Sequence, residues 1–276
     1  MSAGLTFHIA PRALNLDRAF SAHYLFADSV RHVIDGHVRA EPYYRIATKR
    51  AAVALNESVL ERRMRELFAL DLNPLICMTR QLSSELALFK AWNTWQEHVA
   101  LAVRTVVRGN ANESFRVDRR QVSYADDPPA ARNAGLCALN ILTGVARNNR
   151  ERGYVIDDRA ECGLSRIASE LGLEHTVVYD AARFFEEHRG RNVSQLCRAL
   201  GCSRRTLERH FRVFGLTAEE LKMASALIGA TNSLWGTSSL TEIAFEHGFS
   251  DHAHMTRAFR HACGMPPSVL RGLVRH

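Results

Sequence analysis

The sequence of 276 residues predicts a mainly α protein in two parts. One pattern of apolar, glycine and basic residues occurs twice in the last hundred residues. It predicts a C-terminal all-α domain with two helix-turn-helix units joined by a long helix. The earlier part has several apolar runs at helical spacing, two short strand-like runs and only five glycines before residue 151. It is therefore expected to form a helix-rich or mixed α/β domain rather than a β-barrel.

Three helices and two strands are expected before residue 151. Apolar residues at helical spacing predict helices over 56–70, 82–109 and 130–150. The second helix carries Leu88, Trp92, Trp95, Val99, Val103 and Val106 on one side. Its two tryptophans are interpreted as core residues rather than as stacking platforms for a ligand. The strand-like runs are Tyr43 to Ile46 and Phe115 to Tyr124.

The segment from Ile167 to Leu173 has two interpretations. It imitates the first half of a helix-turn-helix unit, but Ala182 stands where the second half would carry Phe. We interpret Ser165 to Gly172 as a separate helix and Val178 to His188 as the first helix of the C-terminal domain. A third unit is the alternative. The domain boundaries are expected at 1–160 and 161–276.

The repeated pattern lies in residues 196–211 and 243–259. Five pairs of positions match: Cys197 with Ala244, Gly201 with Gly248, Leu207 with Met255, Arg209 with Arg257, and Phe211 with Phe259. The offset is 47 residues for the first two pairs and 48 for the others, so the second copy has one extra residue.

Each residue type in the pattern suits a helix-turn-helix unit. A small residue lets the two helices approach, and Gly takes the left-handed conformation of the turn. Ser203 and Ser250 are expected as N-caps of the second helices. Those helices keep apolar anchors at i and i+4, while the opposite faces carry hydrogen-bonding side chains that could enter a DNA major groove. The connecting helix is expected at 218–235, where Gly229 costs about 1 kcal/mol relative to Ala.

The last hundred residues resemble the DNA-binding domain of the AraC/XylS family of bacterial transcription regulators. The resemblance is carried by Leu240 to Asp251, Met255 to Arg260 and Gly264 to Arg271. It covers about residues 176–276 and implies seven helices. The chain departs from the family pattern at Leu221, Ala226, Met255 and Leu270.

The resemblance also implies a set of DNA-contacting residues. The base-facing residues would be Arg205, Glu208, Arg209, His252, Ala253, Thr256 and Arg257. Arg204, Thr206 and Ser250 would contact the DNA backbone. Arginine can form a bidentate pair with guanine, which agrees with the assignment. Glu208 has two open roles, since it could accept from cytosine or orient a neighbouring arginine. His252 and His254 are interpreted as facing DNA rather than a metal.

Composition and cysteine spacing argue against several other functional classes of protein. The net charge is +7, and residues 176–276 contain 13 Lys and Arg against 9 Asp and Glu, which suits a phosphate-facing surface. The six cysteines lack metal-ligand spacing and are interpreted as small apolar residues. A related class of DNA-repair enzymes needs four zinc-binding cysteines near the N-terminus, where this chain has only Cys77 in its first 130 residues. No enzyme activity, metal or cofactor is expected.

The expected function is sequence-specific transcription regulation, with activation as the direction that the resemblance implies. Its partners would be double-stranded DNA and RNA polymerase. The N-terminal domain would sense a small molecule or dock a protein co-activator, as in activators of type III secretion operons, and it could form a homodimer. No apolar run reaches the length of a membrane span and no secretory signal is apparent, so no membrane partner and a cytoplasmic location are expected.

Overall fold

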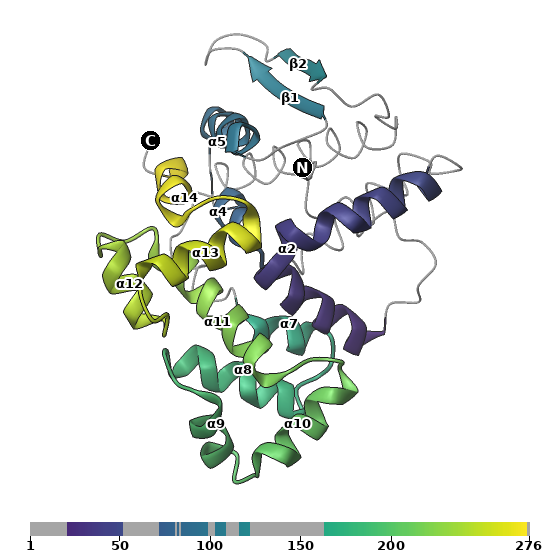
Figure 1. The fold of residues 1–276 in the computed structure, drawn as a ribbon, viewed down its shortest axis with the longest axis vertical. Helices are drawn as coiled ribbons and strands as arrows, with labels where there is room; N and C mark the ends of the chain where they lie inside the picture. The colour runs from purple at the N-terminus through teal and green to yellow at the C-terminus, as the bar shows by residue number, and fades with distance from the viewer. Residues whose placement is uncertain are drawn as a thin grey trace.

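The computed structural model of the chain describes residues 21–51, 72–80, 82, 84–98, 103–108, 116–121 and 163–274. Within these ranges the chain is mainly helical, as predicted (Figure 1). The helices expected over 56–70 and 130–150 lie outside the described residues. None of the described helices is long and apolar enough to cross a bilayer.

Three helices and a hairpin make up the described N-terminal part. They are α2 (Ala22–Ala51), α4 (Pro74–Arg80), α5 (Glu85–His98), β1 (Val103–Arg108) and β2 (Arg116–Gln121). A kink at Asp35 interrupts α2. The strands pair antiparallel, with Val103 opposite Gln121 and Arg108 opposite Arg116. The strand expected from Phe115 to Tyr124 is thus confirmed as β2.

One predicted helix is too long, and one predicted strand is wrong. The helix expected over 82–109 ends at His98, and the last residues of that range form β1. Val103 and Val106 fit helical spacing, but the β-branched residues of this segment also suit a strand, and pairing with β2 decides between the two. The run from Tyr43 to Ile46 lies inside α2. A run this short does not interrupt a helix that continues on both sides, because each added residue gains a backbone hydrogen bond. Leu88 and Trp92 are buried, which confirms them as core residues.

Eight helices follow residue 163. They are α7 (Leu164–Glu170), α8 (Val177–Glu187), α9 (Val193–Ala199), α10 (Arg204–Val213), α11 (Ala218–Ser233), α12 (Leu240–Glu246), α13 (His252–Cys263) and α14 (Pro267–Val274). The stretch from α8 to α14 contains the seven expected helices. Figure 1 shows α9 and α10 on one side of α11, and α12 and α13 on the other. Cys77, Cys197 and Cys263 are buried among apolar side chains, which agrees with their interpretation as small apolar residues.

The N-terminal helix α2 packs against α11 and α13 (Figure 1). Phe26 of α2 meets Phe214 edge to face, with ring centroids 6.1 Å apart. Arg31 of α2 lies 3.4 Å from the carboxylate of Glu220 and also donates to the carbonyl of Gly215. These contacts join the N-terminal part to the end of α10 and the start of α11.

Buried Asn73 makes a second link between the two parts. Its side-chain amide donates to the carbonyl of His32 in α2 at 3.0 Å and to that of Ala262 in α13 at 2.6 Å. Its side-chain oxygen accepts from the backbone N–H of Leu75 at 3.1 Å. One side chain therefore joins α2, α4 and α13.

Candidate nucleic-acid interface

The first helix-turn-helix unit consists of α9, a glycine turn and α10. Gly201 has a φ of 61°, the left-handed conformation that the turn requires. Ser203 is the N-cap of α10, because its hydroxyl accepts from the backbone N–H of Thr206 at 3.1 Å. Leu207 and Phe211 are fully buried. The sequence prediction for this unit is confirmed.

The second unit consists of α12, a turn at Gly248 and α13. Gly248 has a φ of 80°, and Met255 and Phe259 are fully buried. The N-cap is Asp251 rather than Ser250, so this part of the sequence prediction is wrong. Asp251 accepts from the backbone N–H of His254 at 2.6 Å. The physical reason is the extra residue of this copy, which lies between Gly248 and α13 and moves the cap one position along the chain.

Exposed basic side chains cover the solvent face of α10. Arg204, Arg205, Glu208 and Arg209 are all exposed there. Arg204 lies 3.1 Å from Glu208 in an i,i+4 ion pair, so Glu208 orients a neighbouring arginine in the DNA-free chain. Arg205 and Arg209 have no intramolecular hydrogen bond or ion pair among the described residues. Thr206 is half-buried, and its hydroxyl lies 2.9 Å from that of Ser203.

The solvent face of α13 is smaller and less strongly charged. His252, Ala253 and Arg257 are exposed, and half-buried Thr256 lies 3.4 Å from the ring of His252. His254 differs from the other predicted residues. Its ring is half-buried edge-on against Phe249 and lies 3.2 Å from the hydroxyl of Ser250. His254 therefore supports the turn, and Ser250 is exposed beside it.

The α7–α8 hairpin does not favour a third DNA-reading unit. Its candidate second helix, α8, exposes Asp180, Arg183 and Glu187. Arg183 is paired with Glu187 at 2.6 Å, so this face presents two carboxylates and no free arginine among the described residues. A phosphate backbone would be repelled rather than attracted.

The two units also contact each other directly, which the sequence did not indicate. The loop before α9 meets the turn of the second unit, where Gly190 faces Gly248 and Arg189 pairs with Glu246. His247 lies against Gly229 of α11, and a β-carbon on Gly229 would be 2.5 Å from the imidazole Nδ1. The only signal in the sequence was a glycine in the middle of a helix, which marks a close approach.

His247 is held neutral at this contact. Burial lowers its pKa to about 4, and its Nε2 lies 2.9 Å from the hydroxyl of Ser233. At the cap of α13, the backbone N–H of His254 lowers the pKa of Asp251. Asp251 therefore stays charged next to the positive end of the α13 helix dipole. No cluster of metal ligands occurs among the described residues.

Comparison with known proteins agrees with this geometry. Residues 196–272 match the family model described as a helix-turn-helix domain. These residues form an AraC-type helix-turn-helix domain. The chain is therefore a DNA-binding transcription regulator. The resemblance of the C-terminal residues is confirmed for this helix-turn-helix domain.

One solved structure matches along most of the chain. It is the crystal structure of transcriptional regulator CdpR from Pseudomonas aeruginosa, with 14% sequence identity and a TM-score of 0.33. The match covers 93% of this chain and 99% of that chain. No curated protein matches.

Proposed function

We propose that the chain is a sequence-specific transcription activator whose two units bind adjacent major-groove segments of one operator. The observation that supports this proposal is the pair of recognition helices, α10 and α13. Each has an exposed arginine on the side opposite its two buried apolar anchors. Arg205 and Arg209 on α10 and Arg257 on α13 are available to guanine edges. His252, Ala253 and Thr256 complete the base-facing set, and Arg204, Thr206 and Ser250 contact phosphates.

The length of α11 supports this arrangement. Its 16 residues span about 24 Å, and the two units lie at opposite sides of it. Units held in this way can reach major-groove segments one helical turn, about 34 Å, apart on the same side of the duplex. The contact between Gly190 and Gly248 and the ion pair of Arg189 with Glu246 fix one unit against the other. One monomer would then bind both segments.

The N-terminal part, residues 1–160, modulates DNA binding in this proposal, and residues 161–276 bind DNA. Helix α2 contacts the end of α10 through Phe214 and the end of α13 through the Asn73 junction. A small molecule, a protein co-activator or a second subunit that shifts α2 would alter the relation between the units.

The test is to select operators for the full chain from random DNA and footprint the best sequence with hydroxyl radicals. Two protected segments about 10 base pairs apart are expected. A single protected segment would overturn the two-unit arrangement. Transcription in vitro with RNA polymerase then measures direction, because an activator raises the transcript level and a repressor lowers it.

A further inference from the structure

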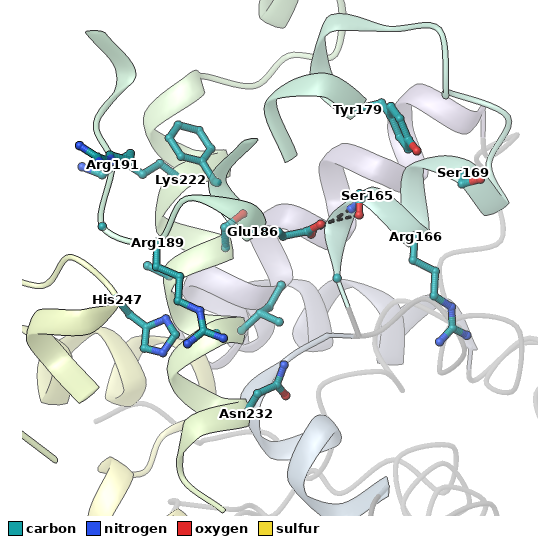
Figure 2. A pocket seen from close by; sticks show the side chains of 17 residues that line it. Ser165, Arg166, Ser169, Tyr179, Glu186, Arg189, Arg191, Lys222, Asn232 and His247 are labelled. Atoms are coloured by element: carbon teal, nitrogen blue, oxygen red, sulfur yellow. Dashed lines mark hydrogen bonds between the residues drawn. The ribbon is translucent and has the colours of Figure 1, made fainter. Parts of the chain in front are cut away.

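A cavity of about 730 Å³ lies between α7, α8 and α11 and reaches His247 at the end of α12 (Figure 2). Neither recognition helix contributes a lining residue, so the cavity is distinct from the proposed DNA-binding face. Its volume falls in the range of small-molecule sites.

Two buried polar atoms in the cavity lining have no hydrogen-bond partner among the residues that the structure describes. They are the hydroxyl of Ser225 and the side-chain oxygen of Asn232, both on α11. Ser225 is only 8% exposed. The two residues are seven apart, so they share one face of α11, with Gly229 between them. Buried polar groups almost always have a partner, and leaving one unpaired costs about 1–3 kcal/mol. This wall therefore offers two hydrogen-bonding positions to a ligand.

Basic side chains gather on one side of the same cavity. Figure 2 shows Arg189, Arg191 and Lys222 together there, with Asn232 further along α11. Arg189 is paired with Glu246, and Lys222 lies 3.5 Å from Glu219. The carboxylate side chains are 42% exposed in Glu246 and 56% exposed in Glu219. Ion pairs this exposed contribute little, so an anionic ligand can compete for the two cations.

The carboxylate in the cavity is already satisfied. Glu186 accepts from the backbone N–H of Ser165 at 3.1 Å and from its hydroxyl, which caps α7 where Gly163 has no side chain to do so. Burial raises the pKa of Glu186. This side chain holds α7 in place and is not available to a cationic ligand, so the excess charge of the cavity is positive.

We propose that this cavity binds a small organic anion that carries hydroxyl groups, of the sugar phosphate or hydroxycarboxylate class. Its anionic group lies at Lys222, Arg189 and Arg191, and its hydroxyl groups meet Ser225 and Asn232. The ligand would touch the loop before α9 and the helix that connects the units. An effect of the bound anion on operator binding rests on the proposed function. Binding of the anion to the cavity does not.

Calorimetric titration of the full chain tests the site with three probes. Ribose 5-phosphate and gluconate represent the two anion classes, and ribose is the neutral control. At least one anion should bind with a Kd below about 1 mM, and ribose should bind at least about tenfold more weakly, because a hydrogen bond to a charged group is worth about 1.5–3 kcal/mol. The anion that binds more tightly identifies the class. Absence of binding by both anions at 10 mM (roughly −2.7 kcal/mol of standard free energy), or equal binding of ribose, would overturn the proposal.

Four variants locate the site. Lys222→Gln and Asn232→Leu should each weaken anion binding about tenfold. Ala226→Leu, which fills the cavity and removes no polar group, should weaken binding with little change in Tm. The matched control is Arg212→Gln, which removes an exposed cation outside the cavity and should leave the Kd unchanged. Equal losses for Lys222→Gln and Arg212→Gln would indicate non-specific charge attraction and overturn the assignment.

A competition experiment distinguishes two possible occupants of the cavity, a small anion and a phosphate of the DNA backbone. A random-sequence duplex should not displace the bound anion, since neither recognition helix lines the cavity. Displacement by the duplex in the wild-type chain would assign the cavity to the DNA backbone and overturn the proposal. The titrations need no operator, so their outcome stands whether or not the chain shows two-segment footprinting.

Discussion

Gly190 and Gly248 face each other so closely that a β-carbon on Gly248 would lie 2.8 Å from the Cα of Gly190. Both residues have positive φ, at 71° and 80°. The turn of the second unit thus packs backbone to backbone against the loop that precedes the first unit. The close approach leaves no room for a side chain at Gly248.

Gly248→Ala should destabilise the chain by more than Gly201→Ala. Both positions have positive φ and would incur about 1 kcal/mol or more of backbone strain. Only position 248 adds a collision with backbone, since a β-carbon at Gly201 would meet nothing within 4 Å. Urea unfolding of the two variants measures the difference. Equal losses would show that the Gly190 contact contributes nothing to stability.

Asp251→Ala should cost about 1 kcal/mol of stability, because it removes the N-cap of α13. Ser250→Ala is the matched control and should cost much less, since Ser250 is exposed and does not cap the helix. Chemical denaturation compares the two. A larger loss of stability for Ser250→Ala would show that Ser250 is the N-cap, as the sequence repeat predicted.

Arg209→Ala and Arg257→Ala should each weaken specific operator binding by about 1–3 kcal/mol and relax the preference at one base pair. Arg212→Ala, on the same helix but outside the predicted base-facing set, is the control and should mainly reduce the salt dependence. Binding to the selected operator and to random DNA is measured for each variant. If Arg209→Ala weakens both DNAs equally, Arg209 contacts phosphate rather than a base.

The helix-turn-helix domain could be predicted in detail because its constraints are local. The glycine turns and the buried anchors such as Phe211 follow from spacing within about twenty residues, whereas the seven helices were implied by the resemblance to the AraC/XylS family. The cap at Asp251 was missed because the extra residue could be placed on either side of Ser250. Gly190 and Gly248 are far apart in the chain, and His247 and Gly229 belong to different helices. Periodicity describes single helices, so it cannot reveal either contact.

The N-terminal part was less predictable for a related reason. Val103 and Val106 satisfy helical spacing and strand propensity at once, and only pairing with β2 selects the strand. Asn73 looks like an ordinary loop residue in the sequence, yet it joins three helices. Its role depends on which carbonyls the fold brings to it.

Acid should destabilise the chain through His247. The folded pKa of about 4 lies below the usual 6.5, so the unfolded chain binds the proton more readily between these values. Stability should be unaffected by this group above pH 6.5 and should fall as the pH drops towards 4, by up to about 3 kcal/mol. Urea unfolding at pH 7.5 and pH 5 is compared for the wild type and His247→Gln. A pH dependence that is the same in both would rule out His247 as its source.

Asn73→Ala should destabilise the chain by about 1–3 kcal/mol, because two buried carbonyls lose their donor. The matched control is Thr79→Ala, which removes a buried hydroxyl that donates to the carbonyls of Leu75 and Ile76 within α4 itself. Hydrogen exchange should report faster exchange in α13 for Asn73→Ala and not for Thr79→Ala. Unchanged exchange in α13 would mean that Asn73 does not hold this helix.

Because of the packing of α2, the DNA-binding half should not fold stably as an isolated fragment. Phe26 and Val30 of α2 are as fully buried as the anchors of the recognition helices, and they belong to the same continuous core. Cutting the chain before α7 would leave an apolar strip bare and invite aggregation. The two halves should instead melt in one cooperative transition. A ligand or partner that changes the position of α2 would then act directly on the DNA-binding helices, because both halves share one core.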